Sequence, residues 1–237
     1  MDGPTVLKGV VAHRGTPRLH RDNTIAGIVA AARLGAVAVE VDVRTTADGV
    51  PVLHHDPSLS RWRRRATALE ALPLAAVRAR APHVPTLAEA VAALAPSGVP
   101  LVLDLGGVRT ARACLDVLDA TCPDRDAVRR RAWFCGAADA LTWLRAADDG
   151  LGLLLSWDAR RPPSPPVVDA VAPTMVNPQH GAVTPAVVDG WHARGVGVCT
   201  WTVDRPAVRE RLFGWGVDAV ISNDVARAVG EHARAGA

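Results

Sequence analysis

The feature that most restricts the fold of this chain is a regular alternation of short apolar runs with amphipathic segments. The apolar runs have the length of β-strands, and most of them are followed by a stretch with helical spacing of its apolar residues. The strand candidates are residues 6–13, 36–44, 50–55, 99–105, 132–135, 151–155, 170–176, 196–203 and 218–222. The helix candidates are residues 25–34, 86–95, 108–121, 137–148, 184–194, 206–215 and 224–235, and residues 61–85 have weaker helical character.

This alternation predicts an α/β fold, and the number of repeats indicates which one. If the run 50–55 is an excursion beyond the second strand, eight strand–helix units remain, the number in a (β/α)8 TIM barrel. An open doubly wound sheet is the alternative, but no glycine-rich phosphate loop follows the first strand. Hydrophobic residues make up 49% of the chain, and no low-complexity linker divides it. We therefore expect residues 1–237 to form a single domain.

Residues 36–56 are the most informative stretch, because they place acidic residues inside a strand. Glu40 and Asp42 alternate with valines, so both carboxylates share one face of the strand and the valines share the other. The turn signal Asp48-Gly49 follows, and the chain then returns as a second strand. The connection is too short for a parallel crossover and predicts an antiparallel hairpin, with His55 opposite Glu40.

Several polar residues fall at the carboxyl ends of the first barrel strands, where TIM barrels carry their active sites. They are His13, Glu40, Asp42 and Asp104, with His55 returned to the same rim by the hairpin. Three carboxylates without a thiolate favour a hard divalent cation, Mg²⁺ or Ca²⁺. Two histidines beside them suit general acid and base catalysis near neutral pH, and Arg14 suits contact with a phosphate.

Charge and cysteine content exclude some other functions. The net charge is +3, and the basic runs Arg61–Arg65 and Arg129–Arg131 lie in no nucleic-acid-binding motif, so we interpret them as solvated and expect no nucleic-acid partner. The four cysteines show no metal or redox spacing, and Cys135 and Cys199 lie in apolar runs that predict buried thiols. With neither a signal-peptide pattern nor a membrane-spanning apolar run, we expect a cytoplasmic protein without stable membrane insertion.

Five pieces of the sequence together resemble the glycerophosphodiester phosphodiesterase family, and they extend over nearly the whole chain in the same order as in the family. The pieces are VAHRGTP, RDNTIAGIVAAARLGAVAVEVDVRTTADGVPVLHHDPSLSR, VPTLAEAV, VCTWTVD and GVDAVISND. The resemblance implies a metal-dependent (β/α)8 enzyme. It implies His13 and His55 as the acid–base pair, Arg14 on the phosphate and Glu40 and Asp42 as metal ligands. Trp201 matches an aromatic residue beside the substrate.

The sequence departs from the family pattern at a few positions. Asp22 stands where the family usually has Glu, and Asp104 matches the third metal-ligand position with a shorter side chain. Gly106 stands where the family has a lysine that helps to hold the phosphate, so a cation that would stabilise transition-state charge is missing. Arg109 is a candidate replacement for it.

The residues and the resemblance together predict hydrolysis of a small-molecule phosphodiester, with a glycerophosphodiester giving glycerol 3-phosphate and an alcohol. Two alternatives stay open: a lysophospholipase D-type hydrolase of larger phospholipids, and a barrel that binds phosphodiesters or polyanions with weak or no turnover. The sequence assigns neither the acid and base roles of the two histidines nor the oligomeric state. It also leaves open whether water attacks directly or a cyclic phosphate forms first.

Overall fold

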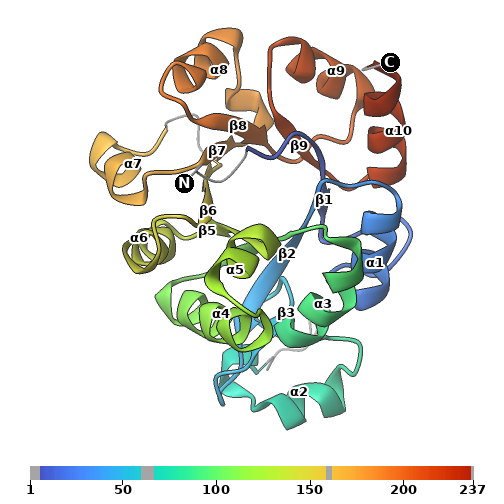
Figure 1. The fold of residues 1–237 in the computed structure, drawn as a ribbon. Coiled ribbons are helices and arrows are strands. Elements are labelled where there is room, and N and C mark those ends of the chain that lie inside the picture. The colour runs from blue at the N-terminus through green and yellow to red at the C-terminus, as the bar shows by residue number, and fades with distance from the viewer. Residues whose placement is uncertain (1–5, 60–66, 159–161, 236–237) are drawn as a thin grey trace.

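The computed structural model describes residues 6–59, 67–158 and 162–235, and its centre is a closed sheet of parallel strands. The sheet runs in the order β1-β9-β8-β7-β6-β5-β4-β2, and the pairing of β1 with β2 closes it into the predicted eight-stranded barrel (Figure 1). The open-sheet alternative is therefore excluded. The strands are β1 Gly9–His13, β2 Ala38–Thr45, β3 Pro51–Leu53, β4 Leu101–Leu105, β5 Ala132–Gly136, β6 Gly152–Trp157, β7 Met175–Pro178, β8 Gly197–Thr200 and β9 Ala219–Ser222.

Helices surround the barrel and separate its strands along the chain (Figure 1). The α-helices are α1 Ile25–Arg33, α2 Leu74–Arg80, α3 Leu87–Leu94, α4 Val108–Thr121, α5 Arg125–Arg131, α6 Ala138–Ala147, α7 Pro165–Val171, α8 Pro185–His192, α9 Pro206–Gly214 and α10 Val225–Ala235. Helix α3 begins with a capping box, because the side chains of Thr86 and Glu89 each accept a hydrogen bond from the other residue's backbone. No helix within the described residues is long and apolar enough to cross a membrane.

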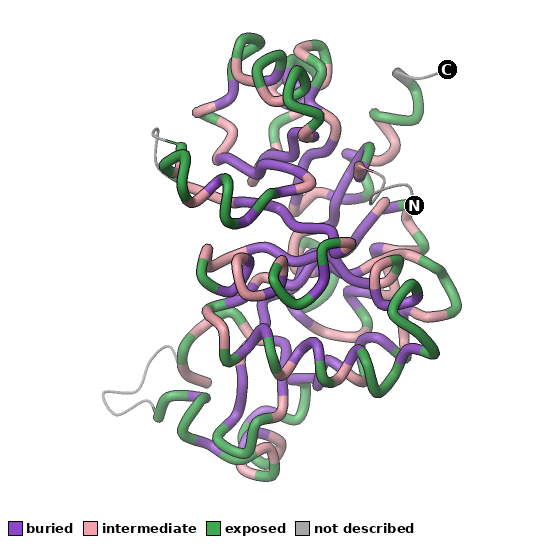
Figure 2. Tube along the Cα trace, turned by 60° about the vertical axis from the view of Figure 1, so that its left-hand side comes forward, coloured by how far each residue is buried: buried purple, intermediate pink, exposed green. Residues whose placement is uncertain are grey.

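The core has two layers because side chains along each strand point alternately into and out of the barrel. One cluster fills the interior and includes Val11, Val102 and Met175. The outward-facing valines of β2, Val39, Val41 and Val43, pack in a second cluster with surrounding helices. The buried strands at the centre and exposed outer faces of the helices are visible in Figure 2. The predicted division of β2 into an apolar face and an acidic face is therefore confirmed.

The hairpin after β2 is antiparallel, as predicted, but its register differs from the prediction by one residue. Val43 pairs with Leu53 and Thr45 with Pro51, whereas a partnership of Glu40 with His55 needs the register shifted by one. The reason lies in the turn, where the backbone N–H of Thr46 donates to the carbonyl of Val50 over 3.0 Å. At Glu40, β2 is instead paired with β1 and β4.

Two helices were not predicted, and one strand begins later than expected. Residues 170 and 171 belong to α7, and β7 begins only at Met175. Helix α5 contains the basic run Arg129–Arg131, of which Arg129 is paired with Asp148. The run Arg61–Arg65 lies outside the described residues. Cys135 and Cys199 are buried free thiols, as predicted.

Candidate active site

The loop after β1 brings a backbone donor onto the first carboxylate. His13 ends β1, and Arg14 and Gly15 follow in the left-handed region with φ of 55° and 85°. This bend directs the backbone N–H of Arg14 to Oε2 of Glu40 at 3.0 Å. A β-carbon on Gly15 would lie 2.7 Å from the carbonyl carbon of Gly27, so the bend also needs glycine for its close approach to α1.

Asn23 holds the second carboxylate in a reciprocal pair of hydrogen bonds. Its side-chain Nδ2 donates to Oδ2 of Asp42 at 2.7 Å, and its Oδ1 accepts from the backbone N–H of Asp42 at 3.1 Å. Asn23 is itself in the left-handed conformation, with φ of 55°, and its backbone N–H donates to the carbonyl of Arg14. Strained backbone of this kind persists where surrounding contacts hold it, often at functional sites.

Three carboxylates converge inside the mouth of the barrel. One oxygen from each of Glu40, Asp42 and Asp104 lies within 4.8 Å of the others. Burial, followed by repulsion from Asp42 and Asp104, raises the pKa of Glu40 well above its usual range. Burial and Asp42 likewise raise the pKa of Asp104. The three predicted metal ligands therefore lie together in a site where their negative charges oppose one another.

The chemistry of this set fits a hard divalent cation. All three groups offer oxygen, the donor atom that Mg²⁺ and Ca²⁺ prefer. The guanidinium of Arg14 compensates the three carboxylates only in part. Its buried Nε lies 3.0 Å from Oδ2 of Asp42, but in an orientation that makes no hydrogen bond. A cation would remove the repulsion that raises the carboxyl pKa values. Glu40, Asp42 and Asp104 form the candidate metal centre of this protein.

His13 lies beside the candidate metal centre. Its Nε2 is 3.8 Å from Oε2 of Glu40, and its Nδ1 is 2.8 Å from Oδ1 of Asn223 on the opposite side of the ring. Burial and the positive charge of Arg14 lower the pKa of the imidazole. The hydrogen bond at Nδ1 therefore orients the ring, and Nε2 faces Glu40 at a distance too long for a hydrogen bond.

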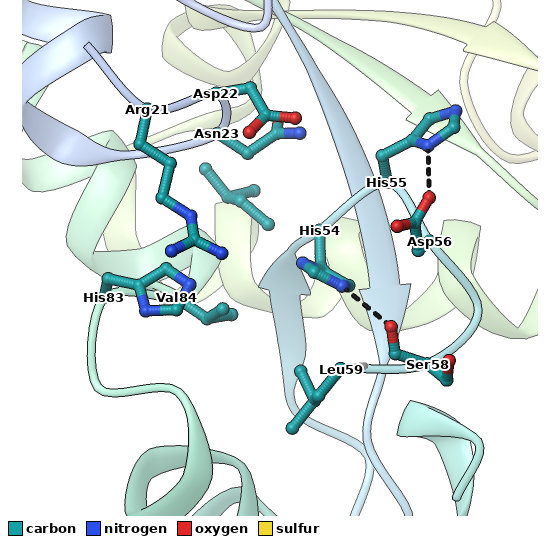
Figure 3. Close-up of a pocket in the computed structure, with 11 residues that line it drawn as sticks. Arg21, Asp22, Asn23, His54, His55, Asp56, Ser58, Leu59, His83 and Val84 are labelled. Atoms are coloured by element: carbon teal, nitrogen blue, oxygen red, sulfur yellow. Dashed lines mark hydrogen bonds and ion pairs between the residues drawn. The ribbon is translucent and has the colours of Figure 1, made fainter. Parts of the chain in front are cut away.

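His55 follows the return strand β3 of the predicted hairpin, in a register one residue away from the predicted one. Arg44, two residues beyond Asp42 on β2, donates hydrogen bonds from Nε and Nη2 to the backbone carbonyl of His55 at 3.2 and 2.8 Å. The Nδ1 of His55 lies 2.9 Å from Oδ1 of Asp56, and Figure 3 shows the ring turned toward that carboxylate. His55 is near enough to Asp104 for its charge to lower the pKa of that carboxyl.

Trp201 lies just beyond the carboxyl end of β8. Its indole Nε1 donates to the backbone carbonyl of Asn177 at 3.0 Å, and its ring packs against the interior core of the barrel. The half-buried ring is thus fixed at the rim of the mouth by contacts that also serve packing.

The position of the missing lysine is open rather than filled. A β-carbon added to Gly106 would meet no atom of the described residues within 4 Å. Arg109, the candidate replacement, is engaged elsewhere, because its Nη2 donates to the backbone carbonyl of Thr46 at 2.8 Å. Arg109 therefore stabilises the hairpin turn in this structure.

A cavity of about 420 Å³ borders the mouth (Figure 3). It shares Asn23 and His55 with the site, and most of its lining is polar. The described residues that line it are Arg21, Asp22, Asn23, Leu53, His54, His55, Asp56, Ser58, Leu59, His83 and Val84.

Several polar residues that support the site escaped prediction from the sequence. Asn23 supports Asp42, Asn223 supports His13, and Asp204 in turn accepts a hydrogen bond from the Asn223 side chain. Single amides and loop carboxylates have no periodic pattern that marks them. Their only signal is position, since each lies within a sequence piece that carries the family resemblance.

The fold and the site together define an enzyme on a TIM barrel with an acidic centre and histidines at its mouth. The model of the glycerophosphoryl diester phosphodiesterase family matches residues 13–227, which include every residue of the site described above. The chain belongs to the glycerophosphodiester phosphodiesterase family.

Individual relatives agree with this assignment. The chain is 30% identical over 234 residues to a probable glycerophosphodiester phosphodiesterase 2 of Mycobacterium tuberculosis, covering 90% of this chain and 86% of that protein. Human glycerophosphodiester phosphodiesterase 1 is 47% identical over 51 residues, which are 22% of this chain and 15% of that protein.

Solved structures show the same fold at low sequence identity. A phosphodiesterase of Oleispira antarctica, solved with its product sn-glycerol-3-phosphate, superposes with a TM-score of 0.84 at 23% identity, covering 96% of this chain and 97% of that one. A glycerophosphodiester phosphodiesterase of Thermotoga maritima superposes with a TM-score of 0.80 at 20% identity, covering 96% and 99%.

Proposed function

We propose that this protein hydrolyses glycerophosphodiesters to glycerol 3-phosphate and an alcohol, with a divalent cation held by Glu40, Asp42 and Asp104. The observation that carries the proposal is the convergence of three repelling carboxylates beside His13 at the mouth of a family barrel. The product bound to the Oleispira antarctica phosphodiesterase is glycerol 3-phosphate, which supports the same product here.

The proposed reaction divides proton transfer between His13 and His55. One histidine takes a proton from the attacking hydroxyl, and the other gives a proton to the oxygen of the departing alcohol. Arg14 contributes positive charge for the phosphate beside Asp42. When bound, the divalent cation neutralises charge on the phosphoryl oxygens and lowers the pKa of the attacking hydroxyl.

The cavity beside His55 favours a polar head group over a lysophospholipid. Arg21, Asp22, His54 and His83 bring charge or hydrogen-bonding capacity to its lining, whereas an acyl chain needs a continuous apolar surface. We therefore place the departing alcohol of a small, water-soluble diester in this cavity.

A panel of phosphodiesters tests the proposed function. Release of alcohol from glycerophosphocholine, glycerophosphoinositol and lysophosphatidylcholine is measured with Mg²⁺, with Ca²⁺ and with a chelator. We expect turnover of the glycerophosphodiesters that the chelator abolishes. Preferential turnover of lysophosphatidylcholine would replace the proposed substrate class, and absence of turnover with either ion would overturn the function.

Single substitutions test the acid–base pair. We expect His13→Ala and His55→Ala each to reduce kcat by about 10²–10⁴-fold, the usual contribution of general acid–base catalysis. Arg109→Ala is the control, because that side chain is engaged with the hairpin turn. Unchanged turnover in both histidine variants would refute their assignment.

A further inference from the structure

A chain of hydrogen bonds extends from His13 away from the candidate metal centre. The imidazole Nδ1 lies 2.8 Å from Oδ1 of Asn223, and Nδ2 of Asn223 donates to Oδ2 of Asp204 at 2.9 Å. Asn223 directly follows β9, and Asp204 lies in the loop between β8 and α9. Residues that follow two other barrel strands, β8 and β9, thus support a ring carried by β1.

The carboxylate of Asp204, at the far end of this series of hydrogen bonds, determines which group donates in each of them. Burial opposes ionisation of Asp204, but hydrogen bonds from Asn223 and Ser222 outweigh it and hold the pKa of Asp204 below its usual range. An ionised carboxylate accepts hydrogen bonds and donates none, so the amide nitrogen of Asn223 must face Asp204. The amide carbonyl then faces His13, and only a protonated Nδ1 can donate to it.

We infer that Asn223 and Asp204 are positioning residues that hold His13 in the tautomer with its proton on Nδ1, which makes Nε2 the base of the reaction. This inference rests on the proposed function and assigns the role that the sequence left open. A neutral imidazole has one proton, so a donor at Nδ1 leaves the lone pair on Nε2. Nε2 is the nitrogen that faces Glu40 and the mouth.

The proton balance of the step follows from this assignment. The attacking hydroxyl gives its proton to Nε2 of His13 while its oxygen bonds to phosphorus. The bond from phosphorus to the alcohol oxygen breaks, and His55 protonates that oxygen. His13 ends the step with one proton more and His55 with one fewer, and exchange with solvent restores both.

The surroundings of the two histidines agree with different roles. The Nδ1 of His55 lies 2.9 Å from Oδ1 of the Asp56 carboxylate. The Nδ1 of His13 faces a neutral amide, which orients the ring without supplying a full negative charge.

Asp204 also makes hydrogen bonds that stabilise the backbone around it. The test must distinguish this structural role from the positioning of His13. Its Oδ1 accepts hydrogen bonds from Ser222 Oγ at 3.1 Å and from the backbone N–H of Asn223 at 2.8 Å. Ser222→Ala removes one of these bonds but leaves the link from Asp204 through Asn223 to His13 intact. It is therefore the matched control.

The test combines ring nitrogen-15 NMR of metal-free protein, at a pH where His13 is neutral, with steady-state kinetics of the metal-loaded enzyme. His13→Gln identifies the His13 signals by their loss. In the wild type we expect a protonated, pyrrole-like signal at Nδ1 and an unprotonated, pyridine-like signal at Nε2. In Asn223→Leu and Asp204→Ala we expect mixed tautomers and a kcat lower by about 10–100-fold, with KM changed by less than about threefold.

The possible outcomes separate the inference from the proposed function. A Ser222→Ala variant that keeps the wild-type tautomer of His13 and the wild-type kcat supports the positioning role of Asn223 and Asp204. A wild-type ring protonated at Nε2, or an Asn223→Leu variant that keeps both tautomer and kcat, overturns the inference. A protein without turnover overturns the proposed function, while the NMR pattern still decides the tautomer on its own.

Discussion

At the scale of single residues, Glu40 is the carboxyl of the site with the most strongly raised pKa. It is buried, faces two other carboxylates, and receives compensation from Arg14 through a backbone hydrogen bond and the charge of the guanidinium. The pKa of Glu40 is consequently raised well above its usual range. Binding of a cation at such a site is coupled to release of the proton from the Glu40 carboxyl.

We predict that the affinity for Mg²⁺ or Ca²⁺ increases with pH. Below the raised pKa of Glu40 the carboxyl keeps a proton that the cation must displace, so affinity rises by up to about tenfold per pH unit and levels off above that pKa. Isothermal titration calorimetry in buffers of different ionisation enthalpy measures the released proton. Glu40→Gln is the control, because it has no proton at this position to release and should show a smaller proton release on binding. A pH-independent affinity would contradict the prediction.

Gly136 is predicted to be essential for the position of Asp104. A β-carbon at this residue would lie 2.4 Å from Oδ1 of Asp104 and 2.3 Å from the carbonyl oxygen of Leu105. We expect Gly136→Ala to weaken cation binding by about 10–100-fold, as loss of support around metal ligands does. Gly98→Ala is the matched control, because Gly98 also has positive φ but a β-carbon there meets no atom within 4 Å among the residues that the structure describes. Equal affinities in the two variants, measured by calorimetry, would refute the role of Gly136.

At the scale of elements, the sequence predicted the helices and strands that have strong periodicity. Helix α4 has the predicted bounds of 108–121. Helix α5 was missed because it is short and buries only Ala127 and Val128. Helix α7 was missed because it begins with two prolines, which are compatible with a first helical turn but resemble a loop in sequence. The hairpin register depends on which residues close the turn, and a dipeptide signal alone does not specify that.

We predict that Asp148 is the principal polar link between α5 and the end of α6. The buried carboxylate accepts hydrogen bonds from Nε and Nη2 of Arg129, at distances down to 2.6 Å, and from the backbone N–H of Gly150 at 2.9 Å. We expect Asp148→Asn to lower the free energy of unfolding by about 1–3 kcal/mol at pH 7. Asp126→Asn, which alters an exposed partner of Arg129, should lower the free energy of unfolding by less than about 1 kcal/mol.

The stabilisation by Asp148 should depend on pH in a defined direction. Burial opposes ionisation, but hydrogen bonds from Arg129 and Gly150 prevail and lower the pKa of Asp148 in the folded state. Its contribution is therefore complete above the unfolded pKa of about 3.9 and is lost as pH falls through the lower folded value. Urea unfolding of wild type and Asp148→Asn should converge in acid. A difference that persists unchanged at low pH would argue for a steric effect.

At the scale of the whole molecule, the barrel is what assembles the site. The carboxylates and histidines could be predicted from their positions at strand ends. The residues that hold them in place could not. Asn23, Asp204 and Asn223 are apart from one another in sequence, and their partnerships depend on loops whose backbone path has no periodic signal. Closure of the barrel by β1, β2 and β9 brings these loops to one mouth.

We predict that a bound cation stabilises the entire fold. Binding to the folded state alone adds about 2.7 kcal/mol when the cation is at 100 times its Kd. For a chain of this length that corresponds to a rise in Tm of about 5–10 °C, which a chelator should reverse. Differential scanning calorimetry measures the shift, and Asp104→Asn should reduce it. A Tm that does not respond to either ion would exclude a structural contribution from the metal.

The bond between His13 and Asn223 joins residues 210 positions apart, and it has a consequence for synthesis of the protein. During translation the ribosome releases β1 long before β9, so a nascent chain carries every proposed metal ligand and both histidines while His13 still lacks its partner. The inference on positioning then implies that a growing chain acquires full hydrolytic competence only after its final strand has docked.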